Sequence, residues 1–275
     1  MTIAVAVKTG SFVVFAADSK LTTVGIAGIN PNGTPNFVEQ TYDNATKVAH
    51  DRNGLLMAMV AGHASIGEIA ATDFIAKRIY SLQPNVATQD QDFSTLVTDM
   101  VTEKQRYWSQ HNVPQAQWLG PTLLLAAPQP GGVGARVWQV DLKGAGAQSS
   151  EILLQGGVRL EGTYDSAFSL LYGFQSEVLA RIAAQLSLNP QNVFQAASQP
   201  QGWLRPLEKM NFAVMPLQDA VDLAFFLATV QVEMERFLPG TPACGGPIDV
   251  MVLHTVPDPR IQFIPGKEVH HPRTS

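Results

Sequence analysis

The chain has 275 residues, 45% hydrophobic and 15% charged, which is enough for one large core or two small ones. A formal net charge of −5 gives no basic surface for nucleic acid, and no apolar run reaches the roughly 18–20 residues of a membrane span. The single cysteine, Cys244, excludes an internal disulfide and a multi-cysteine metal site. With no positively charged start of a signal peptide, we expect a cytoplasmic globular protein that binds neither nucleic acid nor membrane.

Strands are predicted at the start of the chain. Runs of β-branched and small apolar residues predict strands over 2–7 and 11–17. Residues 24–44 are rich in glycine, proline, asparagine and threonine, and this composition predicts a long loop. Two further strands are expected over 46–50 and 55–60, joined by a turn.

Helical periodicity begins near residue 63. The apolar residues that recur there at helical spacing are Ile66, Ile69, Ala70, Phe74 and Ile79, which predict a helix over about 63–82. The remaining elements expected are a helix over 91–109, strands over 123–127, 135–142 and 151–154, helices over 166–186 and 217–237, and strands over 248–255 and 260–264. This order lacks βαβ alternation and favours two antiparallel sheets with helix layers outside.

Few residues of this chain suit nucleophilic catalysis. No Gly-x-Ser-x-Gly motif is present, and a lone cysteine such as Cys244, just before a strand, is more often a packed small residue than a nucleophile. Metal-binding and nucleotide-binding motifs are absent too, so we expect no metal and no cofactor. Removal of Met1 is expected before a residue as small as Thr2. The freed α-amine, with an ordinary pKa of about 7.7–8.0, can accept the hydroxyl proton of the same residue.

Several segments resemble the proteasome β-subunit family of N-terminal nucleophile hydrolases, and most of all its bacterial, betaproteobacterial-type homologue. They are Thr2 at the strand edge, 14–20 (VFAADSK), 46–48 (TKV), 60–63 (VAGH), 218–224 (QDAVDLA) and Gly245-Gly246 before a strand. The resemblance implies an α+β fold, the four-layer αββα sandwich of two antiparallel sheets. It also implies one domain over 1–265, with an insertion at 24–44, a surface excursion at 187–212 and a polar tail at 266–275.

The resemblance also assigns catalytic roles. Thr2 Oγ would attack the scissile carbonyl while the Thr2 amine takes its proton. Lys47 would lower the pKa of that amine, and Asp18 would pair with Lys47, since a buried ammonium without a partner is costly. The backbone N–H of Gly62, at the start of the predicted helix, would stabilise the oxyanion with help from the helix N-terminus.

Residue matching to the family extends to the substrate. The backbone of Thr22 would pair with the substrate. The pocket for the substrate side chain would be lined by Leu21, Ala45, Ala49, Val60 and Ala64. All five are apolar, so we expect cleavage after leucine, tyrosine or phenylalanine rather than after charged residues.

The sequence departs from the family at the residues that support the threonine amine. Before Gly245-Gly246 the family has Asp-x-x-Ser, and here residues 241–244 read TPAC. The family's Gly-Ser-Gly before the third helix is also missing, and residues 161–163 read EGT. The candidates that would support the site are Ser19, Thr163, Ser166, Thr241 and Cys244.

The implied function is that of a threonine-type endopeptidase. It would be a self-compartmentalising assembly of stacked rings, twelve or fourteen subunits in all, that degrades unfolded polypeptide, with an unfoldase as a further partner. The alternatives are an N-terminal nucleophile amidase acting on a small molecule and a non-catalytic ring subunit. In the rings, apolar residues of the first two helices would be buried between subunits, namely Ile75, Tyr80, Leu82 and Trp108.

Overall fold

The computed structural model describes residues 2–29, 35–63, 65–66, 69–82, 89–110, 120–131, 133–173, 176–190, 192–193 and 210–264. The polar tail at 266–275 and most of the predicted excursion at 187–212 lie outside these residues. Among the helices that the structure describes, none combines the length and the hydrophobicity needed to cross a membrane.

Two five-stranded antiparallel sheets form the centre of the fold. The first has the order β12-β1-β2-β13-β14, with bounds Gly157–Gly162, Ile3–Lys8, Phe12–Asp18, Ile248–His254 and Arg260–Ile264. The second has the order β11-β10-β9-β6-β5, with bounds Gln148–Ile152, Ala135–Asp141, Pro121–Pro128, Met57–Gly62 and Val48–His50. Each strand next to another is antiparallel to it, as the absence of βαβ alternation predicts.

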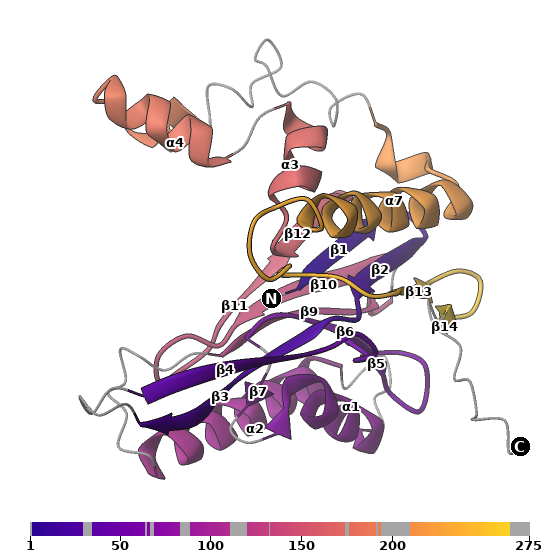
Figure 1. The fold of residues 1–275 in the computed structure, drawn as a ribbon. Coiled ribbons are helices and arrows are strands. Elements are labelled where there is room, and N and C mark those ends of the chain that lie inside the picture. The colour runs from indigo at the N-terminus through magenta and orange to yellow at the C-terminus, as the bar shows by residue number, and fades with distance from the viewer. Residues whose placement is uncertain are drawn as a thin grey trace, which may run out of the picture.

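Helices cover the outer face of each sheet (Figure 1). α7 (Leu217–Glu235) lies over the first sheet with α3 (Asp165–Tyr172) packed against it, and α1 (Ala71–Ser81) and α2 (Gln89–Gln110) lie over the second. α4 (Ser176–Gln185) follows α3, and a short 3-10 helix, η2 (Phe212–Val214), precedes α7. The architecture is the four-layer αββα sandwich of the N-terminal nucleophile hydrolase fold, which confirms the predicted fold class.

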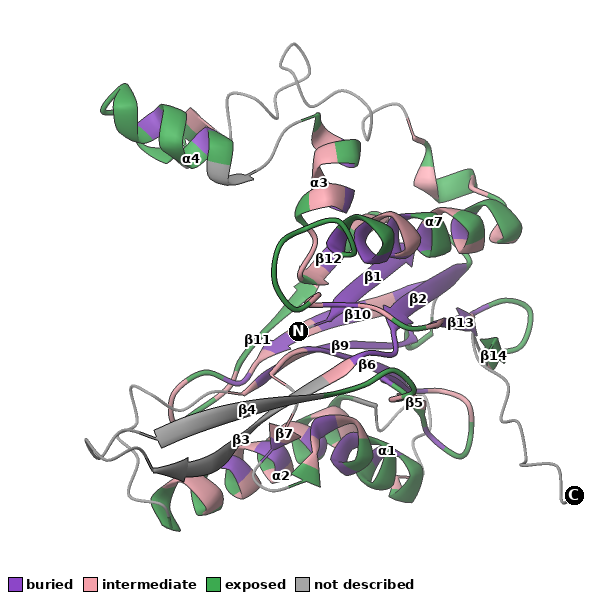
Figure 2. Ribbon diagram, viewed as in Figure 1, coloured by how far each residue is buried: buried purple, intermediate pink, exposed green. Residues whose placement is uncertain are grey.

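Three apolar layers hold the sandwich together, and they explain the composition of the first two strands. In β1, Ile3, Val5 and Val7 pack against the α7 layer, whereas Ala4 and Ala6 face the second sheet. Because both faces of β1 and β2 are buried, these strands are apolar at nearly every position instead of alternating with polar residues. Figure 2 shows this burial in the centre of the molecule and exposure on the helices outside it.

The prediction of a loop over 24–44 is wrong. β3 (Leu21–Ile29) and β4 (Pro35–Tyr42) form an antiparallel hairpin, with Leu21 opposite Tyr42 and a bulge between Ile26 and Gly28. The glycines and asparagines that suggested a loop are interspersed with threonine, valine and isoleucine, which favour extended backbone. Pairing between the two strands stabilises extended backbone here, although the composition is typical of a loop.

The first helix was predicted to begin too early. It begins at Ala71, and two short strands precede it, β7 (Ser65–Ile66) and β8 (Ile69–Ala70), which pair with each other. Ile66 is buried in the same layer as the helix residues, so it matched the helical spacing without being helical. Ile75, expected at a subunit contact, is also fully buried within the chain and is not available to a second subunit.

The later elements also differ from the prediction in two places. The single helix expected over 166–186 is two helices, because α3 ends at Tyr172 and the N–H of Gly173 caps it by donating to the carbonyl of Ser169. The strand β12 was not predicted at all. This strand has glycine at both ends and the charged residues Arg159 and Glu161 within it, so its sequence lacks the apolar pattern typical of a strand. Its pairing with β1 is therefore not evident from the sequence.

A truncation in the layer between the sheets tests which contacts stabilise the fold. Phe15 is fully buried there, and Phe15→Ala should lower the free energy of unfolding by about 3–5 kcal/mol, measured by urea denaturation. Phe237→Ala serves as the matched control, because the Phe237 side chain is 79% exposed, and it should change the same quantity by less than about 0.5 kcal/mol. Equal losses in the two variants would contradict this account of the core.

Candidate active site

Thr2 lies at the start of β1 and is buried, with 5% of its surface exposed. Its carbonyl oxygen accepts a hydrogen bond of 2.7 Å from the N–H of Thr163. Gly162, the residue before, is opposite Ile3 and has a φ of +83°. A Cβ at Gly162 would clash with the Thr2 carbonyl, so only glycine allows this close approach. The segment after β12 therefore fixes the backbone of Thr2.

Asp18 is the centre of the polar contacts beside Thr2. It ends β2, and its fully buried carboxylate accepts four hydrogen bonds. Oδ1 accepts from Lys47 Nζ at 2.8 Å and from the N–H of Ile3 at 3.1 Å. Oδ2 accepts from the N–H of Gly245 at 2.8 Å and from the N–H of Lys20 at 3.3 Å. Through Ile3, the carboxylate is one peptide bond away from Thr2.

The ion pair between Asp18 and Lys47 joins the two sheets. Asp18 belongs to the first sheet, whereas Lys47 precedes β5 of the second and its carbonyl accepts from the N–H of Val60. Only 3% of the Lys47 side chain is exposed, so each charge is compensated by the other rather than by water. Burial raises the pKa of the Asp18 carboxyl, and the Lys47 ammonium and the N–H groups of Gly245 and Ile3 oppose that rise by favouring the carboxylate.

Gly62 ends β6 on the side of the second sheet that faces Thr2. A Cβ built at Gly162, in contact with the Thr2 carbonyl, would lie 3.7 Å from Cβ of Ala61, so the end of β6 comes next to the threonine. Gly62 has a φ of +80°, and it is a strand residue. The expected assistance of a helix N-terminus to its N–H is therefore wrong, because α1 begins only at Ala71.

The predicted supporting residues have different environments. Ser19 is fully buried and its Oγ donates to the carbonyl of Pro247 at 2.6 Å. Thr163 contacts Thr2 through its backbone, the N–H of Ser166 donates to Gln231 Oε1 at 2.9 Å, and Thr241 is exposed.

Cys244 packs in the apolar layer under α7. Burial, together with the nearby charges of Asp18 and Glu235, raises the pKa of its thiol to about 12. Since the thiolate is the nucleophilic form of cysteine, a thiol held protonated at neutral pH is not a nucleophile. This favours Cys244 as a packed residue.

The residues expected to line one substrate pocket are distributed over two grooves. Leu21 and Ala45 line a groove of about 510 Å³ whose other lining residues are Tyr42, Asp43, Asn44, Thr46, Ala70, Thr72 and Asp73. The N–H of Ala45 donates to the carbonyl of Ser19, which places this groove beside the Asp18 segment. Two aspartates share the groove, so its lining is not purely apolar.

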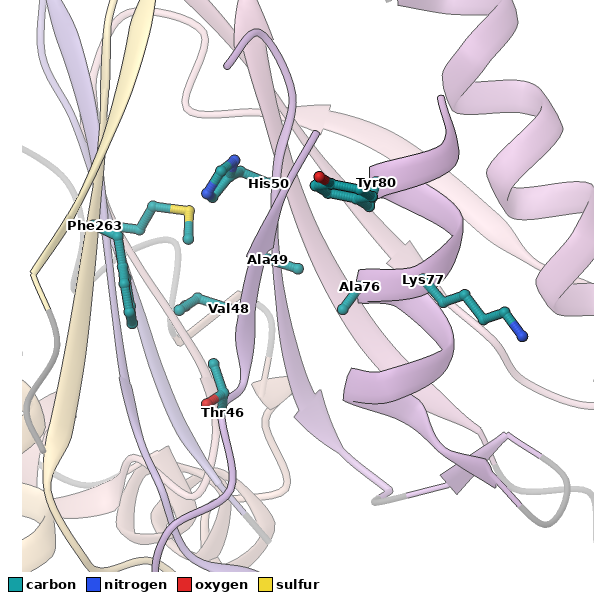
Figure 3. A pocket seen from close by; sticks show the side chains of 9 residues that line it. Thr46, Val48, Ala49, His50, Ala76, Lys77, Tyr80 and Phe263 are labelled. Atoms are coloured by element: carbon teal, nitrogen blue, oxygen red, sulfur yellow. The ribbon is translucent and has the colours of Figure 1, made fainter. Parts of the chain in front are cut away.

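Ala49 lines a second groove, of about 450 Å³, at the edge of the sandwich (Figure 3). There it lies on the side of β5 that faces Ala76 and Tyr80 of α1, while Phe263 approaches β5 from the opposite side. Val60 is buried, and the backbone of Thr22 pairs with Thr41 in the β3–β4 hairpin. Ala64 lies outside the described residues.

Two buried polar residues of α7 were not predicted. Gln231 and Glu235 of α7 are 1% and 7% exposed. They continue the buried stripe of that helix formed by Ala220, Ala224, Leu227 and Ala228. The sequence does contain a signal for this pair, because both residues fall on the same helical face as the small apolar residues. Polar residues on a buried face need hydrogen-bond partners inside the protein.

Comparison with known proteins supports the fold. No protein-family model matches the chain, and no curated protein is similar to it in sequence. Its structure is similar to that of an Anbu mutant from Hyphomicrobium sp. strain MC1, with 14% identity, 98% of this chain and 89% of that chain covered, and a TM-score of 0.50. It is also similar to the helical assembly of the Anbu complex from Pseudomonas aeruginosa, with 13% identity, coverages of 97% and 88%, and a TM-score of 0.53.

These similarities correct the family given by the sequence resemblance. The assignment to the proteasome β-subunit family is wrong, because the similar structures are those of Anbu proteins and no family model supports that assignment. The motifs at Asp18, Lys47 and Gly62 are short. They are compatible with the sandwich fold, but they do not identify one family within it. At identities of 13–14%, the shared feature is the sandwich fold.

Removing Lys47 tests the ion pair. Lys47→Ala leaves a buried carboxylate without its charged partner and should lower the free energy of unfolding by about 3–5 kcal/mol at neutral pH. Without the ammonium, the pKa of Asp18 rises further above its unfolded value, so the folded variant binds that proton more tightly than the unfolded chain. Stability of the variant then falls as pH rises through this range and recovers as pH is lowered.

The measurement is urea denaturation of wild type and variant at a series of pH values from the acidic range to neutral. Lys77→Ala is the control, because Lys77 is exposed on α1 and should show no such pH dependence. A difference between Lys47→Ala and wild type that stays constant over this range would contradict the proposed electrostatic origin.

Proposed function

We propose that this protein is a threonine-dependent amide-bond hydrolase with Thr2 as the nucleophile. The observation that carries the proposal is the buried Asp18–Lys47 ion pair, bonded through Oδ1 of Asp18 to the peptide N–H that follows Thr2. A cation beside an α-amine favours the free-base form of that amine, which is the form that can act as a base. The fold supports the same proposal without deciding the chemistry.

The reaction follows from these groups. With Met1 removed, Thr2 Oγ attacks the substrate carbonyl and its proton passes to the Thr2 amine. The N–H of Gly62 donates to the oxyanion of the tetrahedral intermediate. The amine then gives its proton to the departing nitrogen, the C–N bond breaks, and an ester on Thr2 is left. Water, deprotonated by the same amine, hydrolyses the ester and restores the threonine.

Polypeptide is the substrate class that we propose. The groove that contains Leu21 and Ala45 is open and lies beside the Asp18 segment, and the paired strands β3 and β4 border it. An extended chain can lie along such a strand through its backbone N–H and C=O groups. We propose that this chain is unfolded polypeptide and that Leu21 and Ala45 contact the side chain before the cleaved bond.

Replacement of the nucleophile is the direct test. Thr2→Ala should lower the hydrolysis of fluorogenic peptides and of denatured casein by at least about 1,000-fold, whereas Thr2→Ser should keep part of the activity. Intact-mass spectrometry should find Met1 absent from the active wild type. Hydrolysis by Thr2→Ala at the wild-type rate, or an active protein that retains Met1, would overturn the proposal.

Self-association is the second part of the proposal. It is supported by large apolar side chains on the outer helices, since Tyr80 of α1 and Phe225 and Phe226 of α7 are each about half exposed. The similar Anbu protein from Pseudomonas aeruginosa was solved as a helical assembly. We propose stacked rings of twelve or fourteen subunits, with the α1–α2 layer at the contact between rings.

Analytical ultracentrifugation of the wild type should show this large particle at micromolar concentration. Tyr80→Glu introduces a charge into the proposed contact and should shift the distribution to smaller species. Val133→Glu is the control, because Val133 is also hydrophobic and is 73% exposed, but lies in the turn before β10. A wild-type monomer that still hydrolyses peptide would exclude the assembly while leaving the threonine mechanism intact.

A further inference from the structure

The two polar residues on the buried stripe of α7 are bonded to each other and to two separate segments. Gln231 Nε2 donates to Glu235 Oε1 at 3.2 Å. Gln231 Oε1 accepts from the N–H groups of Ser166 and Ala167, at 2.9 and 3.3 Å, in the first turn of α3. Glu235 Oε2 accepts from the N–H of Ala243 at 2.9 Å. Burying a carboxylate and a carboxamide is costly, so these four hydrogen bonds are needed to keep both groups inside.

Each of these segments reaches the candidate active site within a few residues. The segment that leads into α3 carries Thr163, whose N–H holds the carbonyl of Thr2 at 2.7 Å. The segment that contains Ala243 carries Gly245, whose N–H holds Oδ2 of Asp18 at 2.8 Å. The N–H groups that bind Thr2 and Asp18 thus come from two loops. Both loops are hydrogen-bonded to α7 through the same pair of side chains, Gln231 and Glu235.

The donor and acceptor groups of Gln231 and Glu235 match the N–H groups of the two loops. The Glu235 carboxylate only accepts, and the Gln231 carboxamide both accepts and donates, so the pair can bind the N–H groups of both loops at once. An apolar pair would leave the N–H groups of Ser166 and Ala243 without these acceptors. The loops would then be free to move by the fraction of an ångström that matters for a reacting group.

We propose that Gln231 and Glu235 are positioning residues of the active site, which hold the Thr163 and Gly245 N–H groups on Thr2 and Asp18. The expected effect of these residues on the reaction rate rests on the proposed threonine mechanism. Their expected effect on the order of the two loops does not. The Glu235 carboxylate of α7 accepts from Ala243, two residues before the Gly245 N–H that donates to Asp18.

Leucine at each position removes the hydrogen bonds while keeping similar bulk. Gln231→Leu and Glu235→Leu should each lower kcat by about 10- to 100-fold with KM changed less than about twofold, because the reacting groups are misplaced while the groove is untouched. Glu235→Gln retains one oxygen acceptor, for Ala243, but sets its NH2 group against Gln231 Nε2, so its kcat should lie between those of Glu235→Leu and the wild type. Glu233→Leu is the matched control on the exposed face of the same helix and should leave kcat unchanged.

Amide hydrogen exchange gives a readout that does not need activity. In Gln231→Leu and Glu235→Leu, protection of the Gly245 and Thr163 amides should fall at least about tenfold, while protection in the strand that contains Phe15 should stay at its wild-type value. A merely structural role would lower protection throughout the protein. If a leucine variant does not fold, Glu235→Asp and Gln231→Asn, each one methylene shorter, should show the same local loss to a smaller degree.

The outcomes separate this inference from the proposed function. Wild-type protection of Gly245 and Thr163 in the variants that lack the hydrogen bonds would overturn the inference, as would an unchanged kcat in an active enzyme. A wild-type protein without hydrolase activity would overturn the proposed function, and the inference would then be decided by amide exchange alone.

Discussion

The fold of this protein depends on one buried carboxylate. Asp18 lies at the end of a strand that is buried on both faces, where a charge without partners is expensive. Its four donors come from the first strand, from its own loop, from the second sheet and from the segment before β13. Satisfying this single group therefore fixes the spacing of the two sheets and the positions of the chain segments around Thr2. The contacts that stabilise this charge are therefore also the contacts that position the backbone next to Thr2.

This sharing constrains how the site can vary. Replacing the ion pair by apolar residues would often be tolerated in a core of this kind, since burying two charges gains little net stability. Here the same ion pair is also hydrogen-bonded, through Asp18 Oδ1, to the peptide N–H that follows Thr2. In the proposed mechanism, the pair would favour the free-base form of the Thr2 amine, a role separate from its contribution to stability. The same reasoning applies to Gln231 and Glu235, whose polar contacts order loops instead of filling space.

Local patterns were sufficient for the fold class, and they also predicted the pairing of Asp18 with Lys47 that the structure shows. The apolar strands at the start, the helical spacing of α2 and α7 and the sequence neighbours of Asp18 and Lys47 are properties of short windows. Patterns of this kind could not separate the β3–β4 hairpin from a loop, or a buried Ile66 in a strand from one in a helix, because pairing and packing decided both. The contacts of Gln231 and Glu235 could not be predicted without knowing which segments pack against α7.

The position of Gly245 in the chain has a consequence for biosynthesis. Its contact with Asp18 joins residues 227 positions apart, and β13, which follows it, pairs along the whole length of β2. A ribosome releases β2 long before either partner exists, so the nascent chain holds an incomplete sheet and an incompletely ligated carboxylate. Non-local contacts of this kind form late in folding. The contacts around Asp18 are consequently completed only after residue 245 and the strand that follows it have emerged.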